Sequence, residues 1–353
     1  MTISECAHRW ENKFTIEKHE KQRSAWWSST PLQFVVKCLV IVVALVLAPA
    51  LGKAQTVPSL IRFIVPFPPG GPVDFTARVV ANKVQKDLGN TIIIENRGGA
   101  NGAVGAVAVK LAAPDGGTFL FASSGMITIS PHLVKNLGYD PIKDFVPITM
   151  VAYADAVLVV GNMVKAKTLQ EFVAEAKASS KPLPISSAGV GNITHGQLEL
   201  FKDAARVDLQ HVPYKGGAPA LTDVLTGQIA GTFVGLNVAL PHIRAGTLRA
   251  LAIVGDKRSA SAPEIPTMAE LGYPTVDCLT WMGLMAPKNT PIAISNMIAA
   301  SINRAVNDPE TKAKLAVSGV TPWILSQSEF RDYIARESAR WHAFIDEHHM
   351  AIE

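Results

Sequence analysis

The stretch RFIVPFPPGGPVDFTARVV, Arg62–Val80, contains the pattern that decides the fold. It begins within a short apolar run, Ile61 to Val65, that is typical of a buried strand. The prolines that follow cannot donate backbone hydrogen bonds, so the strand must end there. Gly70 and Gly71 then form a loop with unhindered amides, and apolar residues at helical spacing predict a helix directly after it. A strand, a glycine loop and a helix N-terminus can together hold an anion, although most such loops are only connections.

Three further segments repeat parts of this pattern. SSAGVGNITHGQLELF (Ser186–Phe201) places a Gly-x-Gly loop between a strand and a helix. VPYKGGAPALTDVLTGQ (Val212–Gln228) does the same with Tyr-Lys-Gly-Gly, and FASSGMITISP (Phe121–Pro131) adds a Ser-Ser-Gly loop after another strand. Loops at the carboxyl ends of parallel strands gather at one sheet edge, where ligands bind. If the Pro-Pro-Gly-Gly loop lies on one lobe and the loops of Ser186–Phe201 and Val212–Gln228 on the other, they face each other across a cleft.

Short β-rich runs alternate with amphipathic helical patterns from Gln55 onward, which predicts an α/β chain with one or two mainly parallel sheets. The clearest expected helices are 168–179, 195–205, 291–306 and 329–345. Two apolar runs, Ala156–Gly161 and Asp277–Pro287, flank a middle section that is itself a complete α/β set. We interpret them as paired crossovers between two lobes. The predicted division is 55–156 plus 277–353 for the first lobe and 157–276 for the second.

Residues 1–54 are predicted to be a signal peptide with a long basic region. They carry seven basic residues and four glutamates, and Cys38–Gly52 is a run of fifteen residues without a charge. A spanning helix needs roughly 20 residues, so this run favours a cleaved leader and a periplasmic protein. Cleavage is expected after Ala54, and an uncleaved membrane anchor is the alternative.

Removal of the leader leaves a nearly neutral chain. The full chain has a net charge of +4, and the leader accounts for +3 of it, which leaves +1 and argues against nucleic acid as a partner. Only Cys278 remains, in an apolar run, so it is expected to be a buried hydrophobe. The spacing of Gly98–Ala106, GGANGAVGA, is not that of a dinucleotide loop, and we expect no cofactor. A group of acidic and histidine residues near the C-terminus is expected to be a solvated helix face rather than a metal site: His342, Asp346, His348 and His349.

The residues of these four loops suit a small carboxylate. Glycine amides and the hydroxyls of Ser123, Ser124, Thr194 and Tyr214 are neutral donors, and each helix N-terminus adds roughly half a positive charge. The amides are those of Gly70, Gly71, Gly189, Gly191, Gly216 and Gly217. Such donors bind reversibly and need no catalytic proton.

Seven segments occur in an order that is known from one family: VPFPPGGPVDFTAR, IIIENRGGANGAVGAVAVKLAAPDGGTFLFASS, YDPIKDFVPI, HVPYKGGAPALTDVLTGQI, PHIRAGTLRALAI, EIPTMAELGYP and WMGLMAPKNTP. In them the chain resembles the substrate-binding receptors of tripartite tricarboxylate transporters, often called Bug receptors. The resemblance covers nearly all of Thr56–Glu353. It implies a periplasmic binding protein fold of type II, with two α/β lobes around a ligand cleft, joined by two strands that act as a hinge.

The resemblance also implies that the Pro-Pro-Gly-Gly loop takes a ligand carboxylate through backbone amides and bound water. The ligand-binding residues implied by the residues and the resemblance together are Phe67, Gly70, Gly71, Asp74, Ser123, Ser124, Ala188, Gly189, Gly191, Asn192, Thr194, His195, Tyr214, Lys215, Gly216 and Gly217. This chain departs from the family in having HGQL where His-Leu-Ala-Gly is common and Gly235 where an aspartate is common, and the second departure leaves the substrate open.

Three of these residues have an alternative structural role. Asp74 can orient water or bind an amino group, or can be a first-turn acid favoured by the helix dipole. His195 can donate to the ligand or make a structural bond. Lys215 can attract the anion or be solvated.

The expected function is that of a monomeric, exported receptor that delivers a di- or tricarboxylate, an acidic amino acid or an aromatic acid to a membrane permease. A periplasmic sensor that docks on a signalling partner needs the same cleft. A secreted serine hydrolase is a further alternative, although SSAGVG and ASSG lack the G-x-S-x-G form of a nucleophile elbow.

Overall fold

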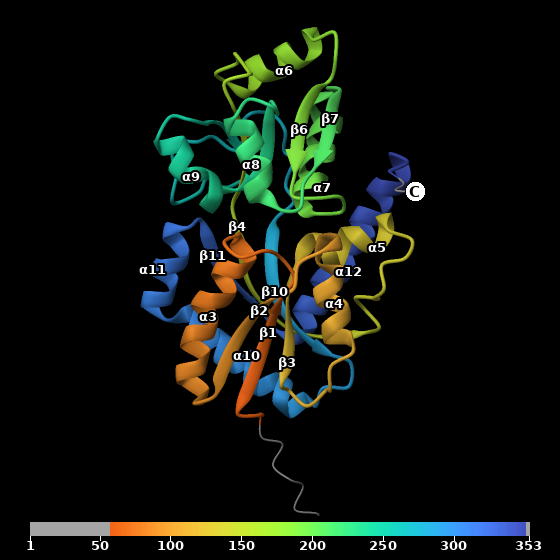
Figure 1. Cartoon of the computed structure of the whole chain (residues 1–353), viewed down its shortest axis with the longest axis vertical. Helices are drawn as coiled ribbons and strands as arrows, with labels where there is room; N and C mark the ends of the chain where they lie inside the picture. Colours follow the sequence, from red (N-terminus) through yellow and green to blue (C-terminus); the bar gives the residue numbers. More distant parts are fainter. Residues whose placement is uncertain (1–56, 351–353) are drawn as a thin grey trace, which may run out of the picture. The chain divides into compact units, whose positions relative to one another are not determined.

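The computed structural model describes residues 57–350, and the predicted leader lies outside them. Within this range no helix combines the length and the apolar character that a membrane span requires. The unit Thr56–Glu353 contains two β-sheets, and Figure 1 shows them one above the other.

The first sheet has six strands in the order β11-β4-β10-β3-β1-β2. Its strands are β1 (Leu60–Val65), β2 (Thr91–Asn96), β3 (Thr118–Ser123), β4 (Phe145–Ala154), β10 (Thr280–Pro287) and β11 (Val320–Leu325). The elements packed around it are α3 (Pro72–Leu88), η1 (Ala100–Gly102), α4 (Ala103–Lys110), η2 (Gly125–Ile129), α5 (Ser130–Leu133), α10 (Ile292–Asn307), α11 (Pro309–Val317) and α12 (Gln327–Glu347).

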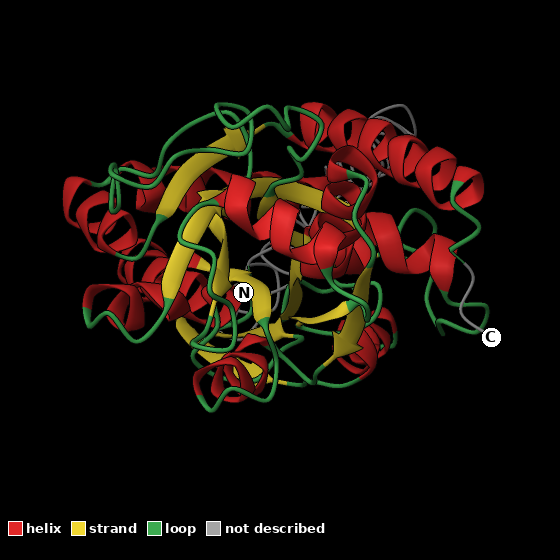
Figure 2. Cartoon of the chain, turned by 90° about the horizontal axis from the view of Figure 1, so that it is seen from above, coloured by secondary structure: helices red, strands yellow, loops and turns green. Residues whose placement is uncertain are grey.

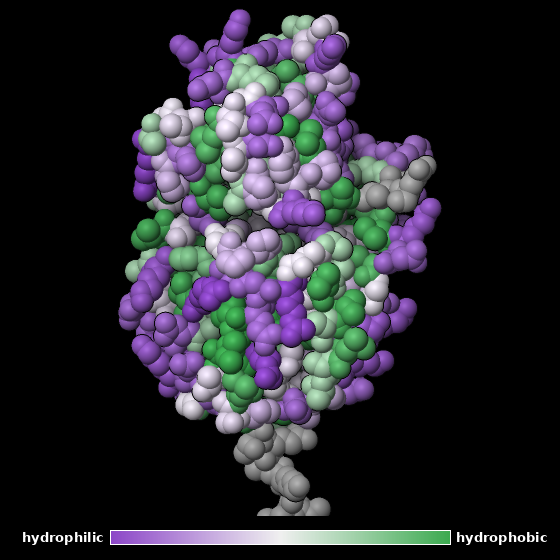
Figure 3. Space-filling view, in the orientation of Figure 1, coloured by the Kyte–Doolittle hydropathy of each residue, from purple (hydrophilic) through white to green (hydrophobic). Residues whose placement is uncertain are grey.

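The second sheet has five strands in the order β7-β6-β8-β5-β9. They are β5 (Ala156–Val160), β6 (Leu183–Ser187), β7 (Leu209–Pro213), β8 (Gly231–Gly235) and β9 (Arg249–Ile253). The accompanying helices are α6 (Leu169–Ala178), α7 (Ile193–Ala205), α8 (Gly217–Leu225) and α9 (Leu236–Arg244). Figure 2 shows helices around the strands, and in Figure 3 hydrophilic residues gather at the end that carries α6.

The expectation of mainly parallel sheets was wrong, because both sheets are mixed. β1 pairs in parallel with β2 and β3, and β6 with β7 and β8. The antiparallel pairs involve β4, β10 and β11 in one sheet and β5 and β9 in the other. The chain crosses from the first sheet to the second and later crosses back, so the strands of the return crossover run antiparallel to those of the outward one. The apolar run that predicts such a strand does not indicate its direction in the sheet.

The passage between the sheets is tied to both of them at Asp155, which separates β4 from β5. The Asp155 N–H donates to the Gly319 carbonyl beside the first sheet, and the Leu236 N–H at the start of α9 donates to the Asp155 carbonyl, each at 2.8 Å. The return passage enters β10 at Thr280. On these connections we keep the two-lobe division of the sequence analysis as a proposal.

The last helix contacts both sheet systems. Phe330 and Ile334 of α12 pack with Trp281 in a core cluster of the first sheet. Trp341 and Ile345, further along the helix, pack in the core cluster that contains Leu198 of α7. The sequence analysis assigned these C-terminal helices to the first lobe, and the second half of α12 also packs against the second sheet system.

The expected helices are present, with ends that differ by a few residues. Pro291 is the N-cap of α10 rather than part of its first turn. Thr168 accepts from the Glu171 N–H at 3.2 Å, but the Glu171 carboxylate accepts from the N–H of Lys167, so α6 has only half of a capping box. The GGANGAVGA segment packs closely against the end of β1, since a Cβ on Gly105 would lie 2.9 Å from Pro66.

Candidate ligand-binding site

A cavity of about 110 Å³ is lined by loops from both sheets. The first sheet contributes the Pro-Pro-Gly-Gly loop, Ser123 at the end of β3 and Thr280 at the start of β10. The second sheet contributes the starts of α7 and α8 and the junction of β8 with α9. The predicted residues that it brings together are Phe67, Gly70, Gly71, Ser123, Ala188, Asn192, Thr194, Lys215, Gly216 and Gly217.

Two other predicted residues, Gly189 and Tyr214, line an adjoining groove of about 810 Å³. The groove shares Phe67 and Lys215 with the cavity. The Tyr214 hydroxyl donates to the Asp223 carboxylate, so it is already engaged within the protein.

Asp74 lies outside the cavity lining and organises the glycine loop instead. Its carboxylate accepts from the Gly70 N–H at 3.0 Å, from Arg78 Nε at 3.0 Å and from Asn96 Nδ2 at 2.8 Å. Burial on its own raises the pKa of Asp74, but the hydrogen bonds from Arg78, Gly70 and Asn96 together lower it. The residue therefore stays ionised and fixes Gly70, which has a φ of +89°.

Three of the six glycine amides named from the sequence are already hydrogen-bonded within the protein. The Gly70 N–H donates to Asp74, that of Gly189 to Ser187 Oγ at 3.2 Å, and that of Gly191 to His195 Nδ1 at 3.3 Å. Among the hydrogen bonds of residues 57–350, the amides of Gly71, Gly216 and Gly217 have no acceptor. Gly71, Gly216 and Gly217 all line the cavity, so it contains three amides that have no acceptor among the described residues.

The helices that begin at the cavity differ in how they are capped. The Asn192 side chain caps α7 by accepting from the Thr194 N–H at 3.1 Å. The caps of α3 and α8 are Gly71 and Gly216, which supply no side-chain acceptor. The N-termini of α3, beside the first sheet, and of α8, beside the second, therefore keep backbone N–H groups that no side chain caps.

His195 and His211 form a stacked pair beside the cavity, with ring centroids 4.0 Å apart and an angle of 13° between the rings. His211 Nε2 lies 2.6 Å from the Ser187 hydroxyl. Burial lowers the pKa of His195 to about 3 and that of His211 to about 4, and the positive charge of Lys202 acts in the same direction. Both rings are therefore neutral near pH 7, and His195 lies outside the cavity lining as a structural residue.

The histidine pair predicts a loss of stability in acid. Because both folded-state pKa values lie below 6.5, the unfolded chain binds more protons, so this contribution is complete above about pH 6.5 and is lost as the pH falls toward 4. We expect His211→Gln to flatten the dependence of the unfolding free energy on pH in this window, measured by urea titration. His349→Asn is the control, since His349 is exposed and its φ of 49° suits asparagine. An unchanged slope in His211→Gln contradicts this role of the pair.

Ser124 and Gly191, the remaining predicted residues, also lie outside the cavity lining. The Ser124 hydroxyl is buried, and Gly191 packs so closely that a Cβ there would lie 2.7 Å from Ser130 Oγ. Both therefore act in packing between the loops.

The sequence missed the walls of the cavity and one polar residue of its lining. The walls include Pro72, Val73, Ile193, Ala218, Pro219, Val234, Gly235 and Val238. Thr280 is 7% exposed, lines the cavity, and has a buried hydroxyl without a hydrogen-bond partner among the described residues. Thr280 lies inside the apolar run Asp277–Pro287 and begins β10, and its role depends on which sheet edge that strand reaches.

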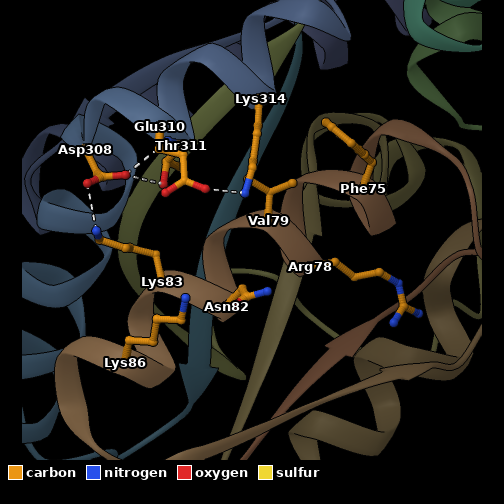
Figure 4. Close-up of a pocket in the computed structure, with 10 residues that line it drawn as sticks. All are labelled: Phe75, Arg78, Val79, Asn82, Lys83, Lys86, Asp308, Glu310, Thr311 and Lys314. Carbon is orange, nitrogen blue, oxygen red and sulfur yellow. Dashed lines mark hydrogen bonds and ion pairs between the residues drawn. The ribbon is translucent and has the colours of Figure 1, made fainter.

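A second pocket, between α3 and α11, lies on the surface and holds none of the predicted residues (Figure 4). Four of its charged groups form two ion pairs, Lys83 with Asp308 and Lys314 with Glu310, each at 2.7 Å. Within residues 57–350 no group of three or more metal-ligating side chains occurs, and this range includes His342, Asp346, His348 and His349. We therefore regard the cavity between the sheets as the candidate site.

Two α/β sheet systems that share a cavity lined by helix N-termini define a two-lobed binding protein. Comparison with known proteins identifies the family. Residues 76–350 match the model of the tripartite tricarboxylate transporter family receptor. The chain belongs to this family, which confirms the resemblance seen in the sequence.

Similar proteins extend over most of the chain. Protein BugT of Bordetella pertussis is 37% identical over 84% of this chain and 91% of its own length. The structure of MatC from Rhodopseudomonas palustris with bound malate is 30% identical, with a TM-score of 0.74 over 80% of this chain and 98% of that one. The structure of R. palustris Rpa4515 with adipate is 28% identical, with a TM-score of 0.78 over 81% and 96%. These matches confirm the predicted two-lobed binding-protein fold.

Proposed function

We propose that the protein is an exported receptor that captures a small carboxylate in the cavity between its two sheets. It then presents this ligand to the membrane permease of a tripartite transporter. The observation that carries the proposal is the set of three unpartnered amides, Gly71 from one sheet and Gly216 and Gly217 from the other. Relatives with bound malate and adipate support a carboxylate as the ligand.

The physical argument rests on the charge of the cavity. Each helix N-terminus presents roughly half a positive charge, and α3 and α8 both begin at the cavity without side-chain caps. Lys215 on the rim adds a full positive charge beside Gly216. A carboxylate that contacts both helices is stabilised by donors from both lobes, which favours the closed form.

We also propose that the protein catalyses no reaction and acts as a monomer in the periplasm. The contact between Ser187 and His211 resembles half of a hydrolytic triad, but Ser187 is 0% exposed and lies outside the cavity lining. A nucleophile needs contact with its substrate, so a receptor explains the cavity better. A sensor that uses the same cavity differs only in its docking partner.

A panel of carboxylates tests the proposal through the melting temperature. A ligand at a hundredfold excess over its dissociation constant stabilises the folded state by about 2.7 kcal/mol, so at least one member should raise the melting temperature by several degrees. The panel contains mono-, di- and tricarboxylates, and uncharged amides of the same acids are the control. No response to any carboxylate, or an equal response to the amides, contradicts the proposal.

A further inference from the structure

We infer that the cavity selects a ligand with a single carboxylate, a compact apolar body and one uncharged hydroxyl or keto oxygen. This inference rests on the proposed function and narrows it to a class of ligand. It depends on three features of the lining: where the charges lie, what the walls are made of, and which hydroxyls lack partners.

The charged groups of the lining can compensate the charge of only one anionic group on the ligand. Lys215 is the only residue with a charged side chain among the described residues that line the cavity, and it is exposed at the rim next to Gly216. A second carboxylate on the ligand has no other cation in the lining to offset its desolvation. A ligand ammonium has no carboxylate there either, because Asp74 lies outside the lining and is occupied by Arg78, Asn96 and Gly70.

The walls of the cavity are apolar on both sides. Pro72 and Val73 begin α3 on one side, and Val234 and Val238 close the other side around Gly235. A Cβ on Gly235 would lie 3.3 Å from Pro72, so the two sides approach closely there. Such walls favour an uncharged ligand body by removing its apolar surface from water.

Two neutral hydroxyls remain in the lining, both from neighbouring strands of the first sheet. Ser123 is 4% exposed and has no partner among the hydrogen bonds described, and the hydroxyl of Thr280 is buried without one. β10 pairs with β3, and Met282, two residues after Thr280, lies opposite Ser123. A rotation of about 120° around χ1 of Thr280 moves its hydroxyl to the position of its methyl group. A buried hydroxyl without a partner is costly, so a ligand oxygen that bonds to it gains affinity.

Acids that share a carbon skeleton and differ in one group test this inference. In the four-carbon series, butyrate, 3-hydroxybutyrate, 4-hydroxybutyrate, succinate and 4-aminobutyrate differ only in that group. The aromatic series consists of benzoate, 4-hydroxybenzoate and terephthalate. Titration calorimetry on the folded protein should show a hydroxy acid binding about tenfold more tightly than its parent and than the matching dicarboxylate.

The variant Thr280→Val removes the hydroxyl and keeps the shape. It should reduce the preference for the hydroxy acid to less than threefold and leave the affinity for the parent acid within threefold. Because the Thr280 hydroxyl has no partner among residues 57–350, the melting temperature should not fall. Thr76→Val makes the same chemical change at another buried, unpartnered hydroxyl that lies outside the cavity lining, and it should keep the full preference.

The outcomes separate this inference from the function on which it rests. If a dicarboxylate or an amino acid binds most tightly, the inference is wrong but the proposed carboxylate receptor is not. The same holds if no acid of these two series binds while other acids of the carboxylate panel do. A preference that survives Thr280→Val also overturns it. Failure of every carboxylate to bind overturns the proposed function itself.

Discussion

Replacement of Gly71 by proline is expected to weaken carboxylate binding by roughly tenfold to a hundredfold while the fold stays intact. A hydrogen bond to a charged group contributes about 1.5–3 kcal/mol, and proline removes the N–H that makes it. Gly71 has a φ of −76°, which suits a proline ring, and its N–H has no acceptor among the described residues. The substitution therefore removes no hydrogen bond from the protein itself.

Gly71→Ala is the matched control for this variant. It retains the N–H, and its methyl group meets no atom of the described protein within 4 Å. Titration calorimetry with the acid that raises the melting temperature most should show a much smaller loss for alanine than for proline. Equal affinity of the proline variant and the unsubstituted protein excludes this amide from the site.

Replacement of Trp341 by alanine is expected to lower the free energy of unfolding by about 3–5 kcal/mol. Trp341 is 1% exposed and packs in the core cluster of the second sheet, although its helix begins beside the first. Its ring lies so close to Gly196 of α7 that a Cβ there would be 2.4 Å away. Removal of the Trp341 ring therefore removes much of the contact between α12 and α7.

Urea unfolding at pH 7 measures this effect, and Glu347→Ala is the control because Glu347 is exposed on the same helix. The control should change stability by less than about 0.5 kcal/mol. A loss below 1 kcal/mol for Trp341→Ala means that α12 contributes little to the second sheet, contrary to the packing described.

The sequence predicted the local elements of the site because proline and glycine determine local backbone geometry. Pro66, Pro68 and Pro69 end β1, and α3 begins directly after Gly71. The same reasoning placed the glycine loops before α7 and α8. Loops at strand ends are set by residues a few positions apart, so a single sequence contains the information.

The features that the sequence did not predict depend on residues far apart in the chain. Thr280 reaches the cavity only because β10 lies between β3 and β4. The Asn96 side chain on β2, 22 positions away, joins Arg78 and Gly70 in hydrogen-bonding the Asp74 carboxylate. The apolar walls form where α3 and α9 approach each other at Pro72 and Gly235. Neither spacing nor composition encodes these contacts, since they arise from the packing of whole elements.

The central claim is that backbone amides of both lobes bind one carboxylate together. The most direct test is an NMR titration of protein labelled with ¹⁵N-glycine, using the acid that stabilises the protein most. The amide signals of Gly71, Gly216 and Gly217 should all shift with one dissociation constant. The amide signals of Gly89 and Gly246, whose N–H groups are hydrogen-bonded away from the cavity, should not shift. Shifts confined to the glycines of one lobe, or absent from all three, contradict the account.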